Sequence, residues 1–474
     1  MIDETVYGSN YKLVKYKSFD APRYDPNKPR IKDIIWNNYD WLEELDESGK
    51  ARPVILDNIQ RTLLCKTLYL GYDAYDCDSC DNFIWLFRHC HSRFCTSCGI
   101  KLQKTLAAKA EVLCVDAKHR HMVFTIPKEY RKFFRENRSL LNILFVASRN
   151  TLMKMFNKSL FDKVRRKKYI VRNPKDNYYL FRNYDKLNIF GEIATLHTFG
   201  RDLKWNPHIH ALVPELIYDS KNNSIKHINH FNYESLRKTW MYEVNRLLLE
   251  AYPKSIKIKN LINNEYKKRD NGFYVYAKAE LQDDDRYTKK INSKNIKDCV
   301  NYMMRYAGRP VMAESRILSY DKVDDSVSYF YEDHATNEKI TVNETGKQLL
   351  GKMIIHIPDK NFRMTRYYGF YNNKCNDILD IINELLGKEN KIHHSKAQRK
   401  ALLKDKLNKL KFRTQLMDTY NRDVLKCGCG GTFKYIFTYN PLEGGTNDRY
   451  YRKNCIDEMR EMWLSRGSPT TRLN

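Results

Sequence analysis

Residues 191–216 read GEIATLHTFGRDLKWNPHIHALVPEL and decide the fold of the central part of the chain. Two β-rich runs, 191–200 and 207–216, are joined by a polar connection and predict strands. On the second strand His208 and His210 would project from one face, while Ile209 enters the core. The pattern therefore predicts a strand that offers two ligands to one metal ion.

The His-x-His spacing has little specificity by itself, because it also occurs at 89–91 and 119–121. Two histidines on a strand are also compatible with a purely structural role. A carboxylate or a third imidazole usually completes a metal site of this kind. The nearest candidate is His197 on the preceding strand, with Asp202 behind it.

Residues 77–98 read CDSCDNFIWLFRHCHSRFCTSC and contain two CxxC pairs. Each pair can present both sulfurs to one ion, so Cys77, Cys80, Cys95 and Cys98 predict a tetrahedral zinc site. Four protein ligands leave no open position for water, which makes this zinc structural. Cys90, or one of the histidines beside it, could replace a ligand or help to hold a second ion.

The remaining cysteines carry weaker predictions. In KCGCGGTF a single residue separates Cys427 from Cys429, and this spacing weakens the prediction of a second zinc site. Cys375 and Cys455 could complete such a site only if the fold brought them close. Two cysteines that flank the zinc segment are expected in the core: Cys65 and Cys114.

The segment SKNIKDCVNYMMRYAGRPVMAESRI, residues 293–317, has apolar residues at helical spacing that end before Gly308. Tyr302 and Tyr306 are four residues apart and would share one face of this helix. A phenol is a weak nucleophile at neutral pH and needs a cation nearby to attack a phosphodiester. With 34 tyrosines in the chain, ordinary core packing is the alternative interpretation.

The charge balance favours a polyanionic partner. Lys and Arg number 84 against 57 Asp and Glu, a formal net charge of +27, and phosphate neutralisation by such residues releases counterions. The sequence contains no apolar stretch of membrane-spanning length, no secretory signal and no GxxxxGK[ST] motif. We therefore expect a soluble, cytoplasmic, nucleoid-associated protein of bacterial type, with no nucleotide cofactor.

These elements occur together in a known family. The run CDSC, HCHSRFCTSCG, HRHMVFTIP, LHTFGRDLKWNPHIHALVP and YMMRYAGRPVMAESRI resembles the insertion-sequence transposases of the rolling-circle HUH type, from about residue 30 to about residue 375. The resemblance implies an N-terminal zinc-binding domain followed by a nuclease domain. That domain has a central antiparallel sheet flanked by helices, with HMVFTIP beside the strand of PHIHALV.

The resemblance also implies roles for individual residues. His208 and His210 would be the paired ligands of a catalytic Mg²⁺ or Mn²⁺, with His197 as a candidate third ligand, and Tyr302 and Tyr306 the nucleophiles. Basic residues around the tyrosine helix and in FDKVRRKKYIVR would contact DNA, although a solvated basic face is the alternative. These residues are Arg305, Arg309, Arg316, Arg165, Arg166, Lys167 and Lys168.

We therefore predict an α+β protein with four successive parts. They are an N-terminal helical segment (1–60), a zinc-binding domain (61–117), a tyrosine nuclease domain of the HUH type (118–320) and a mixed, basic C-terminal α/β region (321–474). Within the nuclease domain, the polar residues 254–292 are expected to hold an inserted hairpin.

The predicted function is transposition by nicking and rejoining of single-stranded or hairpin DNA at element ends through a phosphotyrosine. A plasmid-type replication initiator or relaxase is a rival with the same chemistry. A zinc-containing DNA-binding regulator without catalysis is a rival from another class. A zinc-dependent hydrolase is weaker, because no HExxH or similar motif accompanies the histidines.

Overall fold

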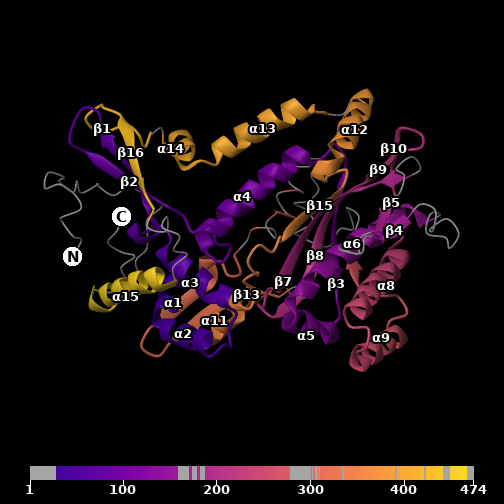
Figure 1. Ribbon diagram of the computed structural model, residues 1–474, viewed down its shortest axis with the longest axis horizontal. Helices are drawn as coiled ribbons and strands as arrows, with labels where there is room; N and C mark the ends of the chain where they lie inside the picture. The colour runs from indigo at the N-terminus through magenta and orange to yellow at the C-terminus, as the bar shows by residue number, and fades with distance from the viewer. Residues whose placement is uncertain are drawn as a thin grey trace. The chain divides into compact units, whose positions relative to one another are not determined.

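The computed structural model describes residues 28–158, 170–172, 179–181, 187–277, 300, 303–304, 308, 310–333, 336, 338–389, 392–420, 423–440 and 449–466. The chain forms two compact units (Figure 1). One unit comprises residues 1–102, 310–357 and 408–474, and we call it the cysteine unit. The other comprises residues 103–309 and 358–407, and we call it the histidine unit. Both contain helices and antiparallel strands, so the predicted α+β class is confirmed.

The two units differ from the four linear parts that the sequence predicts. The expected C-terminal region is divided, since residues 358–407 belong to the histidine unit and the flanking segments to the cysteine unit. The physical reason is strand pairing. β15 (Thr365–Gly369) pairs with β7 (Gly191–Phe199), whereas β16 (Phe433–Tyr439) pairs with β1 (Tyr72–Cys77).

The histidine unit is built on a five-stranded antiparallel sheet of order β11-β3-β8-β7-β15. The predicted pairing of HMVFTIP with the PHIHALV strand is confirmed, because β3 (His119–Thr125) pairs with β8 (Trp205–Pro214). β11 (Val275–Tyr276) is an edge strand of this sheet. The further strands are β4 (Ile170–Arg172), β5 (Tyr179–Phe181), β6 (Asn188–Ile189), β9 (Leu216–Asp219) and β10 (Ser224–His227).

Helices of the same unit cover one face of this sheet. Phe124 on β3 packs against Trp240 on α8 (Tyr233–Ala251), with ring centroids 5.1 Å apart. α6 (Leu141–Phe156) packs against α8, β7 and β8, as Figure 1 shows. The unit also contains α5 (Lys128–Glu136), α9 (Ile256–Lys268), α12 (Asn376–Lys388) and most of α13 (Lys396–Lys409). The expected hairpin at 254–292 is wrong for its first part, which is the helix α9.

The cysteine unit combines short helices with two three-stranded sheets. The sheets have the orders β16-β1-β2 and β12-β13-β14. The elements are α1 (Ile31–Asn37), α2 (Tyr39–Glu47), α3 (Pro53–Leu64), β2 (Phe83–Phe87), β12 (Ile317–Asp321), β13 (Ser326–Glu332), β14 (Lys339–Thr345), α11 (Gly346–Ile354), α14 (Phe412–Tyr420) and α15 (Arg449–Arg466). α4 (Thr96–Leu113) begins in this unit and continues into the other.

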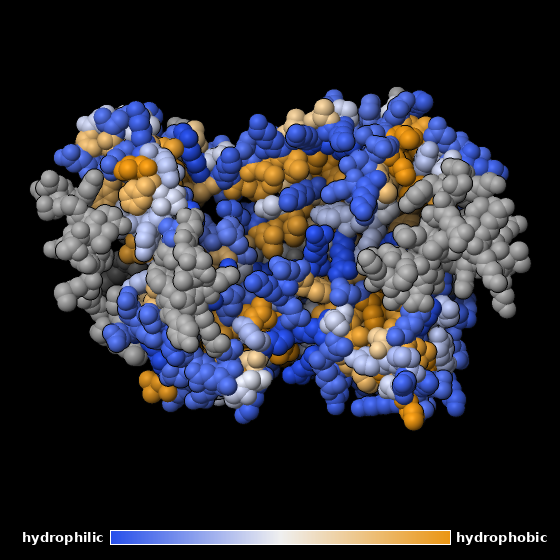
Figure 2. Space-filling model, in the orientation of Figure 1, coloured by the Kyte–Doolittle hydropathy of each residue, from blue (hydrophilic) through white to orange (hydrophobic). Residues whose placement is uncertain are grey.

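Hydrophilic residues predominate on the face drawn in Figure 2, in keeping with a chain in which 30% of residues are charged. None of the helices within the described ranges combines the length and apolar character needed to cross a membrane.

Candidate metal centres

Three histidines meet on one face of the five-stranded sheet. His197 on β7 lies directly opposite His208 on β8, and His210 follows two residues later on the same strand. The three side chains are buried, and their nearest ring nitrogens lie within 4.8 Å of one another. The strand periodicity therefore brings together the three residues that the sequence singled out. Asp202 lies outside this group and pairs instead with Lys204.

Hydrogen bonds orient two of these rings. His208 Nδ1 lies 2.6 Å from the carbonyl oxygen of Asn206. Because a carbonyl only accepts, this Nδ1 carries the proton, and Nε2 keeps its lone pair for a metal. His210 Nδ1 lies 2.8 Å from Nε2 of His121 on β3, and the two rings are stacked with centroids 5.1 Å apart. The proton shared between His121 and His210 lies on the Nδ1 side of the His210 ring, and the Nε2 atom of His210 faces His208.

His121 is a hydrogen-bond partner of His210 that the sequence did not single out. It belongs to a His-x-His pair that looked nonspecific, but the β3–β8 register sets it opposite Leu212, diagonal to His210 on the same face. The signal available in the sequence was its position on the strand predicted to lie beside PHIHALV. Until the register of β3 on β8 is known, the spacing of His121 and His119 does not distinguish them from the other His-x-His pairs.

Burial keeps these imidazoles neutral. It lowers the pKa of His208 to about 4 and that of His121 to about 4, and it lowers the pKa of His210 well below its usual value. The charged form loses hydration in the sheet, and the neighbouring imidazoles add to the effect on His210. Neutral imidazole is the form that binds a metal ion, so His208 and His210 can bind one without deprotonation.

The spacing of the donor atoms fits an ion with adjacent ligands at right angles. The Nε2 atoms of His208 and His210 are 3.0 Å apart. Neighbouring ligands of an octahedral ion at about 2.1 Å are separated by about 3.0 Å. Ligands of a tetrahedral zinc ion at about 2.1 Å are about 3.4 Å apart. The spacing of this one pair of nitrogens therefore corresponds to two neighbouring ligands of one divalent ion.

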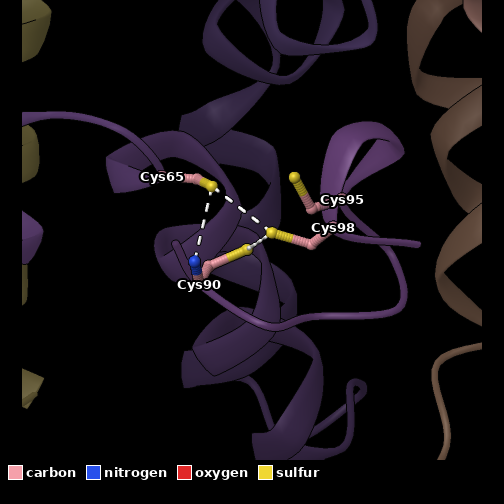
Figure 3. A group of neighbouring side chains, drawn as sticks. All are labelled: Cys65, Cys90, Cys95 and Cys98. Carbon is pink, nitrogen blue, oxygen red and sulfur yellow. Dashed lines mark hydrogen bonds between the residues drawn. The ribbon is translucent and has the colours of Figure 1, made fainter. Parts of the chain in front are cut away.

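The cysteine unit holds two further groups, and the first is drawn in Figure 3. Cys65 follows the end of α3, Cys90 follows β2, and Cys95 and Cys98 stand at the start of α4. Their sulfurs point toward one another, with Cys98 Sγ 3.6 Å from the sulfurs of both Cys65 and Cys90. Tetrahedral zinc with sulfurs at about 2.3 Å separates them by about 3.8 Å, so the group fits zinc.

Two of these thiols are poised to ionise. Hydrogen bonds from Cys65 and Cys90 lower the pKa of the Cys98 thiol to about 7, and the same neighbours lower the pKa of Cys95. Both stand at the N-terminal end of α4, where the helix dipole favours negative charge. Thiolate is the form that binds zinc.

The second group consists of Cys77, Cys80, Cys427 and Cys429. Cys77 ends β1 and Cys80 lies in the turn before β2, while Cys427 and Cys429 precede β16. Cys77 Sγ is 3.5 Å from Cys429 Sγ, and Cys80 Sγ is 3.7 Å from Cys427 Sγ.

These two groups correct the predicted zinc ligands. The CxxC pairs were expected to close one site, but Cys77 and Cys80 belong to one group and Cys95 and Cys98 to the other. The reason is the β1–β2 hairpin, which carries the first pair to its tip while the second pair stands at the start of α4. Cys90, which we expected either to replace a ligand or to help to hold a second ion, lies in the first group.

Other cysteine expectations change as well. Cys65 is buried, as expected, but its sulfur is part of the first group rather than ordinary core. Cys427 and Cys429 meet Cys77 and Cys80, whereas Cys375 and Cys455 belong to neither group. The contacts join residues 347 and 352 positions apart, which no local spacing could indicate.

The predicted nucleophiles Tyr302 and Tyr306 lie outside the described residues. So do most of the predicted DNA contacts, namely Arg305, Arg309, Arg165, Arg166, Lys167 and Lys168. Arg316 is described and is half-buried in a short 3-10 helix, Glu314–Arg316, of the cysteine unit.

Comparison with known proteins connects these centres to one class of enzyme. Residues 191–378 match the family described as "Putative transposase", and residues 37–126 match the family described as "Transposase zinc-binding domain", of the IS91 type. The first match contains the histidine group. The second contains the first cysteine group and half of the second.

Two relatives span most of the chain. The "Transposase for insertion sequence element IS801" of Pseudomonas savastanoi pv. phaseolicola is 28% identical over 77% of this chain and 82% of its own length. The "Putative transposase y4qJ" of Sinorhizobium fredii (strain NBRC 101917 / NGR234) is 23% identical over 72% of this chain and 84% of its own. No solved structure matches the chain.

Proposed function

Because the chain belongs to the IS91-type family of rolling-circle transposases, we propose that it nicks and rejoins single-stranded DNA at insertion-sequence ends through a covalent phosphotyrosine. The observation that carries this proposal is the group of three buried imidazoles within the matched residues 191–378. Such a group offers lone pairs to one divalent ion. Phosphodiester cleavage by a phenol needs a cation of this kind.

His197, His208 and His210 would hold the ion. When bound, it supplies a positive charge that polarises the phosphate oxygens and offsets the charge of the transition state. Three nitrogen donors favour Mn²⁺ over Mg²⁺, which prefers oxygen ligands. His121 acts as a positioning residue, because its hydrogen bond fixes the ring of His210.

Tyr302 and Tyr306 are the proposed nucleophiles. The phenol oxygen loses its proton and attacks the phosphorus atom. The bond from phosphorus to the 3′ oxygen breaks, and that oxygen takes up a proton to become a free 3′ hydroxyl. The DNA remains attached through a 5′ phosphotyrosine, so the phosphodiester can re-form without ATP. A second tyrosine could accept the next strand and hold two ends on one chain.

DNA is the partner that this function requires, and the net charge of +27 suits it. Single-stranded or hairpin ends are the proposed form of that DNA. A replication initiator or relaxase would use the same chemistry at an origin, and the zinc-binding match to transposases favours element ends. If the chain were instead a regulator without catalysis, it would bind DNA and would not cleave it.

The test is cleavage of labelled single-stranded element-end DNA with Mn²⁺ or Mg²⁺. The native chain is compared with Tyr302→Phe, Tyr306→Phe and the double variant, with Tyr266→Phe on the exposed face of α9 as the matched control. We expect a denaturant-resistant adduct of protein and DNA in the native chain and the control, and none in the double variant. The single variants rank the nucleophiles.

Two outcomes would overturn the proposal. An adduct that persists in the double variant would exclude these tyrosines. Tight binding without any adduct or nick would favour the regulator. A parallel comparison of His208→Ala with His227→Ala, which alters a half-exposed histidine outside the group, should show loss of metal-dependent cleavage only in the former.

A further inference from the structure

The second cysteine group joins two parts of the chain that lie far apart in the sequence. Cys77 and Cys80 stand at the tip of the β1–β2 hairpin, and Cys427 and Cys429 belong to the turn that leads into β16. β16 then pairs with β1 along six residue pairs, from Tyr72 with Tyr439 to Cys77 with Phe433. Two cysteine-bearing turns therefore meet at one end of a single three-stranded sheet.

The sulfur geometry fits a tetrahedral ion. The separations of 3.5 Å and 3.7 Å run between the two turns, and all four sulfurs lie within 4.8 Å of one another. Zinc with four thiolates at about 2.3 Å requires sulfur separations of about 3.8 Å. A disulfide would need sulfurs at about 2.05 Å. The group is thus spaced for a shared ion and not for a cross-link between sulfurs.

The turns also supply hydrogen bonds of the kind that stabilise thiolates. In each turn the backbone N–H two residues after a cysteine donates to its sulfur, from Ser79 to Cys77 and from Gly431 to Cys429, both at 3.4 Å. The side-chain amide of Asn82 donates to Cys427 Sγ at 3.3 Å. N–H groups directed at sulfur lower the cost of holding negative charge there.

The backbone of the second turn is shaped to approach the first. Gly430 has a φ of +95°, which favours glycine. A Cβ atom on Gly431 would lie 2.6 Å from Cys77 Sγ, so only glycine allows this approach. Only one residue separates Cys427 from Cys429, and these two glycines allow so short a turn to come close to the first turn.

Ordinary burial does not explain this group. Cys429 is exposed, and Cys77 and Cys80 are half-buried. Among the described residues, the hydrophobic cluster beside this group has three buried members, Ile84, Cys427 and Phe433, with partly buried Tyr75, Leu86 and Leu425 packed against it. A cluster of this size supplies little stabilisation, so a structural metal would add to it.

We propose that Cys77, Cys80, Cys427 and Cys429 bind a second structural zinc ion, which joins the C-terminal strand β16 to the N-terminal zinc-binding domain. Both segments of the histidine unit, 103–309 and 358–407, lie in sequence between Cys80 and Cys427. The ion therefore closes a chain loop that contains the whole histidine unit. Closing so long a loop restricts the unfolded chain, which stabilises the folded one.

The test is the zinc content of the full-length chain after reconstitution with excess zinc and removal of unbound metal, measured by elemental analysis. All chains compared carry His208→Ala, so that the histidine group takes up no zinc, and the chain with no further change serves as the native reference. We expect two zinc ions per chain in the native protein and in the control Cys375→Ser, whose cysteine belongs to neither group. The double variant Cys427→Ser with Cys429→Ser should retain one. Cys429→His, which restores a ligand at an exposed position, should recover the second.

A native content of one zinc ion, or two ions in the double serine variant, would overturn the proposal. Limited proteolysis gives an independent readout that tolerates partial misfolding. Cleavage within 423–440 should accelerate in the double variant and with a zinc chelator, and not in Cys375→Ser. Unchanged cleavage in both cases would also count against the ion. Neither measurement involves DNA. A negative result for the second zinc ion therefore leaves the proposed transposase chemistry untouched. A failure of the chain to cleave DNA likewise leaves the zinc count unaffected.

Discussion

The histidine group and the cysteine groups bring metal-binding atoms together by opposite routes. The three histidines stand on two central strands of a five-stranded sheet whose other face packs on helices. The cysteines stand in turns, at a strand end and at a helix start, around a core as small as Ile84, Cys427 and Phe433 in the second group. In the histidine unit the fold holds the ligands in place. In the cysteine unit the ligands stand in turns, and we expect bound zinc to order those turns.

Metal removal should therefore act on the two units in different ways. A site carried by strands keeps its shape when the ion leaves, because backbone pairing and apolar burial maintain it. A site made by turns loses the interaction that orders them, because the binding free energy of a structural zinc is also folding free energy. The following four changes test that distinction.

The largest effect is expected for Cys98→Ser. The loss of a ligand from the first cysteine group should remove zinc stabilisation on the order of 10 kcal/mol and leave the surrounding turns unprotected. Hydrogen exchange should increase in α3 and the start of α4 while β7 and β8 remain protected. Cys114→Ser is the control, since Cys114 belongs to neither group. Equal loss of protection in β7 and β8 would break the comparison.

The next effect is expected for Glu243→Ala in the histidine unit. Glu243 on α8 is fully buried and pairs with Lys154 on α6 and with Arg246 at 2.7 Å. Removing the carboxylate takes the Glu243 charge away from Lys154 and leaves Arg246 only its pair with Glu250, which should cost about 3–5 kcal/mol. Urea unfolding followed by hydrogen exchange in α6 measures this. Glu234→Gln on the same helix breaks only an exposed pair and should cost less than about 1 kcal/mol.

A pH effect of intermediate size is expected at Glu192 on β7. Burial raises the pKa of Glu192 to about 8 from an ordinary 4.5, although Ser148 and Arg149 act in the opposite direction. Between these values the unfolded chain ionises and the folded chain keeps its proton, so stability falls as pH rises. The slope approaches about 1.4 kcal/mol per pH unit and ends above about pH 8.

Glu192→Gln should remove this dependence. Unfolding of the histidine unit is measured between about pH 6.5 and 8, which avoids the titration of the buried histidines. Because burial lowers the pKa values of those histidines, their protonation in the unfolded chain reduces stability only at lower pH. An identical slope in the variant would show that another group controls the pH response.

The smallest effect is expected for His121→Ala. Losing the hydrogen bond to His210 should weaken binding of Mn²⁺ by about 10- to 100-fold without unfolding the sheet. Isothermal titration with Mn²⁺ and hydrogen exchange of β8 measure the two properties separately. His121→Gln, which keeps a hydrogen-bonding group, should recover part of the affinity. A loss of protection in β8 would mean that His121 supports the fold and not the ligand alone.

Much of this protein could be predicted from local sequence patterns. The alternation around Ile209 predicts that His208 and His210 share a face, because side chains alternate along any strand. The paired strands of HMVFTIP and PHIHALV, the α+β class and a zinc-binding N-terminal region were also predictable, the strand pairing and the zinc domain partly through the family resemblance. These features depend on neighbours within a few residues or on sequence motifs that the chain shares with the family.

Tertiary structure decided which ligands meet. The CxxC spacing identifies zinc ligands but not their partners, because a hairpin can separate two nearby pairs while strand pairing joins Cys77 to Cys429 across 352 positions. The same holds for His121, whose contact with His210 depends on the β3–β8 register. The division of residues 321–474 between two units likewise follows from the pairing of β15 and β16 with different sheets. Spacing along the chain determines which chemical groups are available, and long-range backbone hydrogen bonding determines which of them share an ion.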